Sequence, residues 1–231
     1  MSRGIFFGGA QSLDNDLVRK CVIRIPEVTI RLREAQKIMD QSEEYVDLMS
    51  LMNSENRDFQ NFLKYRGALA AAVQTGLYDR YRKTQAEPAI FLGHANGKFA
   101  AGQCCGAESF EAMILESIKP STPSAPVIQG LEMPILSRGA TNARVHSFEV
   151  SDGEGFCESP QECYDVVSMI EKLADEKGLT QLIIIGPGLD AIGELIDHPV
   201  RERVQMLETI EMDPLLGWFW SDIKRLEAVP A

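Results

Sequence analysis

The residues best placed to do chemistry lie at positions 93–97, Gly-His-Ala-Asn-Gly, between an apolar run and a helical stretch. Two glycines separated by three residues, where a strand turns sharply into a helix, are typical of a nucleophile elbow. The residue at the apex of such a turn is held in a strained backbone conformation that exposes its side chain. The N–H groups that begin the following helix can stabilise the oxyanion of acyl transfer. Here the apex is Ala95, whose methyl group cannot attack a carbonyl.

The elements that must position this turn can be read from the apolar pattern. Pro88–Leu92 is a short run of strand character, and a helix is predicted to begin near Phe99. Ile5–Gly9 and Leu182–Ile185 are further apolar strands, and Val204–Leu207 is a last short one. Continuous apolar strands that alternate with helices indicate a parallel sheet covered on both faces. We therefore predict a single α/β domain over residues 1–231, with a mostly parallel sheet and helices on both faces.

The remaining elements follow from periodicity and from turn residues. Phe59–Tyr81 is the longest helical pattern, with apolar residues at three- and four-residue steps. Further helices are predicted at Val28–Ile38 with Pro26 in the first turn, at Tyr45–Met52, at Ser109–Ile118, at Cys163–Lys177 capped by Gly178, at Leu189–Ile196 and at Leu215–Leu226. Two loops are predicted at residues 119–132 and Ser151–Ser159, with a strand at Met133–Ser137.

Around the turn, residues 88–106 (PAIFLGHANGKFAAGQCCG) resemble the malonyl-CoA:acyl carrier protein transacylase, or acyltransferase, family. Its pattern is a strand, Gly-His-Ser-x-Gly-Glu, and an alanine-rich helix ending in glycine. Ala95 stands where the family has its serine, and Lys98 where it has its glutamate. The matching positions are Gly93, His94, Gly97, Ala100, Ala101 and Gly106.

Three other parts of the chain support the resemblance. Ile5–Ser12 is similar to the family's N-terminal strand and glycine-rich oxyanion loop, although Phe7 and Gly9 replace its proline and first glutamine. Pro126–Ser137 is similar to the approach to a late strand. Glu162–Leu195 is similar to the late helix, strand and Gly-Pro-Gly turn. The resemblance implies an acyltransferase large-subdomain core, related to the α/β-hydrolase fold.

What the chain lacks relative to this family bears on activity. Between Ile118 and Pro126 the family carries a ferredoxin-like small subdomain of roughly 60–70 residues, a subdomain size within the ordinary range, and here it is absent. That subdomain would supply the histidine base, and the arginine that binds the malonyl carboxylate also has no match. The resemblance therefore implies no catalytic residue, a degenerate elbow at His94, Ala95, Asn96 and Gly97, and substrate-binding positions at Gly8, Gly9, Ala10, His94 and Asn96.

Composition excludes some classes of function. The net charge of −11 disfavours nucleic-acid binding, which needs a clustered basic face. The sequence contains no apolar stretch of about 20 residues that would span a membrane. The five cysteines form no CxxC pair, as expected for reduced thiols in a cytoplasmic protein. We expect a cytoplasmic protein without cofactor or metal.

The cysteines and histidines allow other functional interpretations. Cys104 and Cys105 lie roughly 14 Å along the helix from Ala95, too far to replace the serine. His94 acting on bound water is an alternative source of catalysis. His146 with Asp152 and Glu154 offers a weak metal hypothesis, and His198 is expected at the surface.

The aromatic cluster Trp218–Trp220 is expected to pack in the core or in an interface. Because the small subdomain is missing, a homodimer surface that includes Phe110 and Met113 is a further hypothesis.

Three functions stay open at this point. The first is a catalytically inactive acyltransferase-like protein that binds acyl carrier protein, acyl-CoA or a synthase partner in fatty-acid or polyketide synthesis. The second is residual transacylase or thioesterase activity through water and His94. The third is a structural oligomer subunit with a covered pocket.

Overall fold

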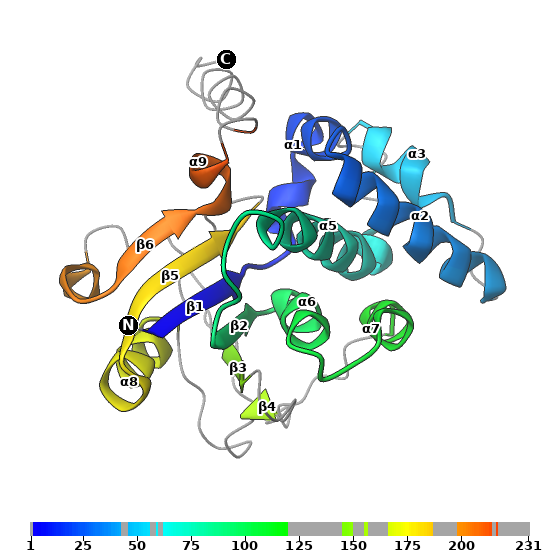
Figure 1. Cartoon of the computed structure of the whole chain (residues 1–231). Helices are drawn as coiled ribbons and strands as arrows, with labels where there is room; N and C mark the ends of the chain where they lie inside the picture. Colours follow the sequence, from blue (N-terminus) through cyan, green and yellow to red (C-terminus); the bar gives the residue numbers. More distant parts are fainter. Residues whose placement is uncertain are drawn as a thin grey trace, which may run out of the picture.

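The computed structural model describes residues 2–42, 46–55, 59, 62–119, 145–149, 155–156, 166–186, 198–213 and 216. These residues form a six-stranded sheet in the order β4-β3-β2-β1-β5-β6 (Figure 1). The strands are β1 Ser2–Phe7, β2 Ile90–His94, β3 Val145–Glu149, β4 Gly155–Phe156, β5 Leu179–Ile185 and β6 Gln205–Glu208. Strands β2, β1, β5 and β6 are parallel, whereas β3 and β4 pair antiparallel at one edge. The predicted α/β class with a mostly parallel sheet is confirmed.

The helices lie on both faces of this sheet. They are α1 Asp16–Val22, α2 Pro26–Gln41, α3 Leu48–Asn53, α5 Arg66–Tyr81, α6 Gly97–Cys104, α7 Phe110–Ser117, α8 Val166–Lys177 and α9 Thr209–Met212, with 3₁₀ turns η1 Gln11–Asp14, η2 Leu63–Tyr65 and η4 Pro199–Glu202. Figure 1 shows α5, α6 and α7 on one side of the sheet and α8 on the other.

Alternation along β1 divides the buried side chains into two cores. Ile5 and Phe7 point into the larger core with α1, α2, α5, α6 and α7, and Phe6 points into the smaller core under α8. This is the period-two alternation of a strand buried on both faces. The sheet is therefore anchored on both sides, and the loops that follow its strands start from fixed positions.

The central helix α5 has every residue from Gly67 to Tyr78 buried. Its glycines allow close approach: a Cβ at Gly76 would lie 2.5 Å from the Cα of Val28 in α2, and one at Gly67 would lie 2.6 Å from the carbonyl oxygen of Ser117. Such distances leave no room for a side chain, so α2 and α7 pack directly against the backbone of α5.

Several predictions of secondary structure need correction. The α-helix predicted over Phe59–Tyr81 begins only at Arg66, after the η2 turn. The bounds of β3 were not predicted, and Gly155–Phe156 forms β4 within the loop predicted at Ser151–Ser159. A two-residue strand is too short to show a hydrophobic period in the sequence. Only its backbone pairing with the neighbouring strand identifies it. Met133–Ser137, Leu189–Ile196 and all of Leu215–Leu226 except residue 216 lie outside the described residues.

Candidate functional site

The turn between β2 and α6 has a strained apex. Ala95 has φ of 50°, and it is the one non-glycine residue with positive φ within the described ranges. Its side chain is exposed, and the helix starts immediately, with the Lys98 N–H donating to the Ala95 carbonyl at 3.3 Å. A left-handed conformation at an alanine costs about 1–2 kcal/mol. The geometry of an elbow is thus present, with a methyl group at its apex.

The two glycines of the turn are required by contacts of the backbone. A Cβ at Gly93 would lie 2.4 Å from the Cα of Lys98, and a Cβ at Gly97 would lie 2.0 Å from the carbonyl oxygen of Phe7. Neither position accepts a side chain without a shift of the main chain. The start of α6 therefore packs directly on the end of β1, which is the reason the chain can turn so sharply.

The loop that follows β1 lies beside the apex. A Cβ at Gly9 would lie 3.7 Å from the Cβ of Ala95, an ordinary van der Waals distance. The two loops meet because β1 and β2 are parallel neighbours whose carboxyl ends share one edge of the sheet. Gly8 is buried, and Ala10 is 3% exposed with its methyl group in the larger core. Gly9, which lies between these two buried residues, is half-buried.

His94 and Asn96 flank the apex but differ in their surroundings. His94 is the last residue of β2 and is 8% exposed, and the alternation of the strand places it on the same face as Leu92, under which α8 packs. Asn96 is half-buried at the start of α6. The backbone N–H groups of this first turn of α6 carry the partial positive charge of a helix N-terminus.

The two adjacent cysteines at the C-terminal end of α6, Cys104 and the capping residue Cys105, do not form a reactive centre. Cys105 is buried, and its Sγ donates to the carbonyl of Gly102 at 3.1 Å. Burial raises the pKa of both thiols, so the protonated form predominates at neutral pH. Their contribution is packing, as the sequence suggested.

The structure corrects one of the remaining candidates and places two others. Met113 is fully buried in the larger core, so it cannot belong to a dimer surface, and Phe110 is half-buried with the guanidinium of Arg31 over its ring at 5.0 Å. His198, expected at the surface, is half-buried and caps η4, its Nδ1 accepting from the Val200 N–H at 3.2 Å.

The metal hypothesis rested on a loop that the structure only partly describes. His146 lies within β3, whereas Asp152 and Glu154 fall outside the described residues. The aromatic cluster Trp218–Trp220 also lies outside them. In the part of the chain that is described, no group of three His, Cys, Asp or Glu side chains could hold a metal ion.

Gln74 of α5 is a residue that the sequence analysis missed. It is 2% exposed, and its Nε2 donates to the carbonyl oxygen of Gly8 at 2.7 Å, which ties α5 to the loop beside Ala95. The signal in the sequence was a single amide among the alanines and valine of an otherwise apolar helix face. A buried polar side chain in such a place is informative, because it needs a specific partner.

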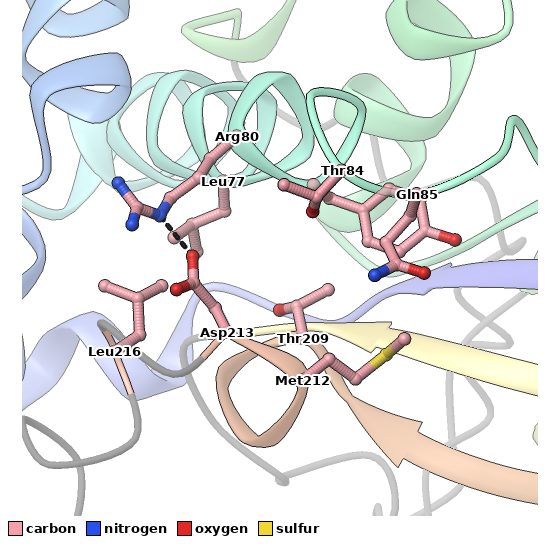
Figure 2. Close-up of a pocket in the computed structure, with 9 residues that line it drawn as sticks. Leu77, Arg80, Thr84, Gln85, Thr209, Met212, Asp213 and Leu216 are labelled. Carbon is pink, nitrogen blue, oxygen red and sulfur yellow. Dashed lines mark hydrogen bonds and ion pairs between the residues drawn. The ribbon is translucent and has the colours of Figure 1, made fainter.

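A separate hollow lies between the end of α5 and α9 (Figure 2). Arg80 and Asp213 face each other across it, with Nε 2.5 Å from Oδ2, and Glu27 contacts the same guanidinium at 3.4 Å. The arginine is thus neutralised from two elements, and this pair holds α9 against α5. The charged residues of this hollow are thus paired with one another, and we interpret their role as structural.

Comparison of the chain with protein families, with curated proteins and with solved structures gave no match. Among the helices within the described ranges, none has the length and apolar character needed to cross a membrane.

Proposed function

We propose that this chain is a catalytically inactive acyltransferase-like protein that binds an acyl thioester, presented by acyl carrier protein or coenzyme A. On this proposal the fold is an acyltransferase large-subdomain core, and the protein is a binding or regulatory partner in fatty-acid or polyketide synthesis. One observation carries it: the strained, exposed apex with φ of 50° is built as an elbow, yet it holds an alanine.

The argument is energetic. The strained apex costs stability, and strain of this kind persists where a site uses the geometry. In the first turn of α6 the N–H groups of Lys98 and Phe99 donate to the Ala95 and Asn96 carbonyls, which leaves those of Asn96 and Gly97 for a ligand. A Cβ built at Gly9 would lie 3.7 Å from that of Ala95, so the loop after β1 borders the apex. These groups suit a carbonyl oxygen. Because Ala95 has no lone pair, the bound carbonyl would be held without a covalent step.

Titration with a series of acyl-CoAs and with acyl carrier protein tests the proposal. We expect saturable binding with Kd below about 1 mM, the weak end of the affinity scale. Gly9→Leu should weaken it at least tenfold, since a side chain at position 9 starts 3.7 Å from the methyl of Ala95 and would fill the space beside the apex. Ala86→Leu adds the same side chain at an exposed position after α5 and serves as the matched control.

Two results would contradict the proposal. One is the absence of binding by any of these ligands at that concentration, with the protein shown to be folded. The other is binding that Gly9→Leu and Ala86→Leu change equally, because the ligand would then lie elsewhere on the molecule.

A further inference from the structure

A buried amide of α5 supports the loop that borders the elbow. Gln74 is 2% exposed, and its Nε2 donates to the Gly8 carbonyl at 2.7 Å across 66 positions of sequence. The same carbonyl oxygen would lie 2.5 Å from a Cβ at Gly97. The Gly8 carbonyl is therefore enclosed between the side chain of Gln74 and the first residue of α6.

This hydrogen bond restrains the segment that lies beside the apex. Gly9 is the next residue, and its Cβ position lies 3.7 Å from the Cβ of Ala95. The segment has a second fixed point at Ala10, whose carbonyl accepts from the Leu13 N–H at 3.0 Å. Rotation of the Gly8 peptide would move Gly9 relative to the apex, and the bond from Gln74 opposes that rotation.

Stability alone does not explain a buried amide at position 74. Its Oε1 is buried and has no hydrogen-bond partner among the described residues. Turning the amide over would bring Oε1 against the Gly8 carbonyl, two acceptors facing each other, so the Gly8 carbonyl fixes the orientation of the amide. A methionine would occupy similar volume without a buried polar atom. The presence of an amide is explained by the carbonyl it holds.

We infer that Gln74 is the positioning residue of the elbow, which holds the Gly8–Gly9 main chain in place beside Ala95. The inference about position stands on the contacts above. Its consequence for affinity rests on the proposed function.

Nuclear magnetic resonance on the unaltered protein gives the first test. The side-chain amide protons of Gln74 should be protected from solvent exchange at least about tenfold relative to an exposed glutamine, because one is hydrogen-bonded in the core. A nuclear Overhauser contact to Gly8 or Gly9 should accompany the protection. Exchange at the rate of a free amide would overturn the inference, and this measurement needs no variant.

Gln74→Met and a matched variant, Thr75→Val, give the second test. Thr75 is the next residue of α5, is 1% exposed, and loses a buried hydroxyl without contact to the loop. In Gln74→Met we expect the N–H groups of Gly9 and Ala10 to exchange about tenfold faster than in Thr75→Val, as loss of one buried hydrogen bond predicts. Amide exchange in β5 should be equal in both.

Affinity for acyl-CoA is the last readout. It should fall in Gln74→Met and stay unchanged in Thr75→Val. Equal loop exchange in the two variants overturns the positioning role. Absence of binding by the unaltered protein refutes the proposed function instead, and the exchange measurements then still decide the role of Gln74. If Gln74→Met does not fold, the first test decides it.

Discussion

Replacing Ala95 by glycine should stabilise the protein, which is unusual for an alanine next to a helix. A left-handed backbone, with φ of 50°, costs an alanine about 1–2 kcal/mol, whereas glycine adopts it freely. Against this gain stands the greater chain entropy that glycine adds to the unfolded state, about 0.4–1 kcal/mol. The net expectation for Ala95→Gly is a gain of about 0.5–1 kcal/mol. No packing is lost, because the methyl group is exposed.

Thermal and denaturant unfolding measure this difference. For a chain of 231 residues, about 1 kcal/mol corresponds to a rise in Tm of about 2–4 °C. Ala174→Gly, inside α8, is the control, and it should lose about 1 kcal/mol because the helical backbone there gives glycine no advantage. If Ala95→Gly lowers the free energy of unfolding as much as Ala174→Gly does, the apex is not strained in solution and the reasoning from strain fails.

Three other predictions concern the glycines near the turn, the carboxylate of Glu27 and the side chain at position 95. Gly97→Ala should destabilise by about 3 kcal/mol or more, since the new methyl meets backbone at 2.0 Å, whereas Gly9→Ala should stay within about 0.5 kcal/mol; urea unfolding compares them. Burial raises the pKa of Glu27, but the hydrogen bond from Lys83 and nearby positive charge outweigh it and leave the pKa below its ordinary value. The stabilisation from this carboxylate is therefore complete above about pH 5 and is lost as pH falls through the lowered pKa. Glu27→Gln should accordingly have a lower free energy of unfolding than the unaltered protein at pH 7, and this difference should shrink as the pH falls to 3, as unfolding measured across that range would show. Ala95→Ser should remain folded yet form no acyl adduct with acyl-CoA in intact-mass spectrometry, because the resemblance places the histidine base in a subdomain that this chain is expected to lack; an acyl-serine formed within minutes would instead favour residual transacylase or thioesterase activity.

The sequence predicted those parts of the fold whose local pattern and tertiary environment agree. Leu182–Ile185 is continuously apolar because β5 is buried on both faces, and Pro26 starts α2 because its fixed φ suits a first turn. Ser109 likewise caps α7, its Oγ accepting from the Ala112 N–H. In each case the residue type has a known structural preference, and the tertiary structure uses it in that way, so the local sequence was enough to predict the element.

Other features depend on contacts between distant residues and leave little trace in the sequence. Strand β4 exists because Gly155–Phe156 pairs with β3, and a two-residue pairing has no period. Met113 looked available for an interface, but α7 turns it into the core against α5. The partner of Gln74 lies 66 positions away, so the sequence could show a buried amide but not what it holds.

The apex itself shows what packing dictates and what it leaves free. Gly93 and Gly97 are constrained by backbone at 2.4 Å and 2.0 Å, so steric contact alone accounts for both. Position 95 has no such constraint, because its side chain is exposed and its only special demand is a positive φ, which glycine would meet best. A turn with a purely structural role would gain stability from glycine there. Alanine instead retains the strain, and on the proposed function it marks an elbow that keeps its geometry without a reactive atom.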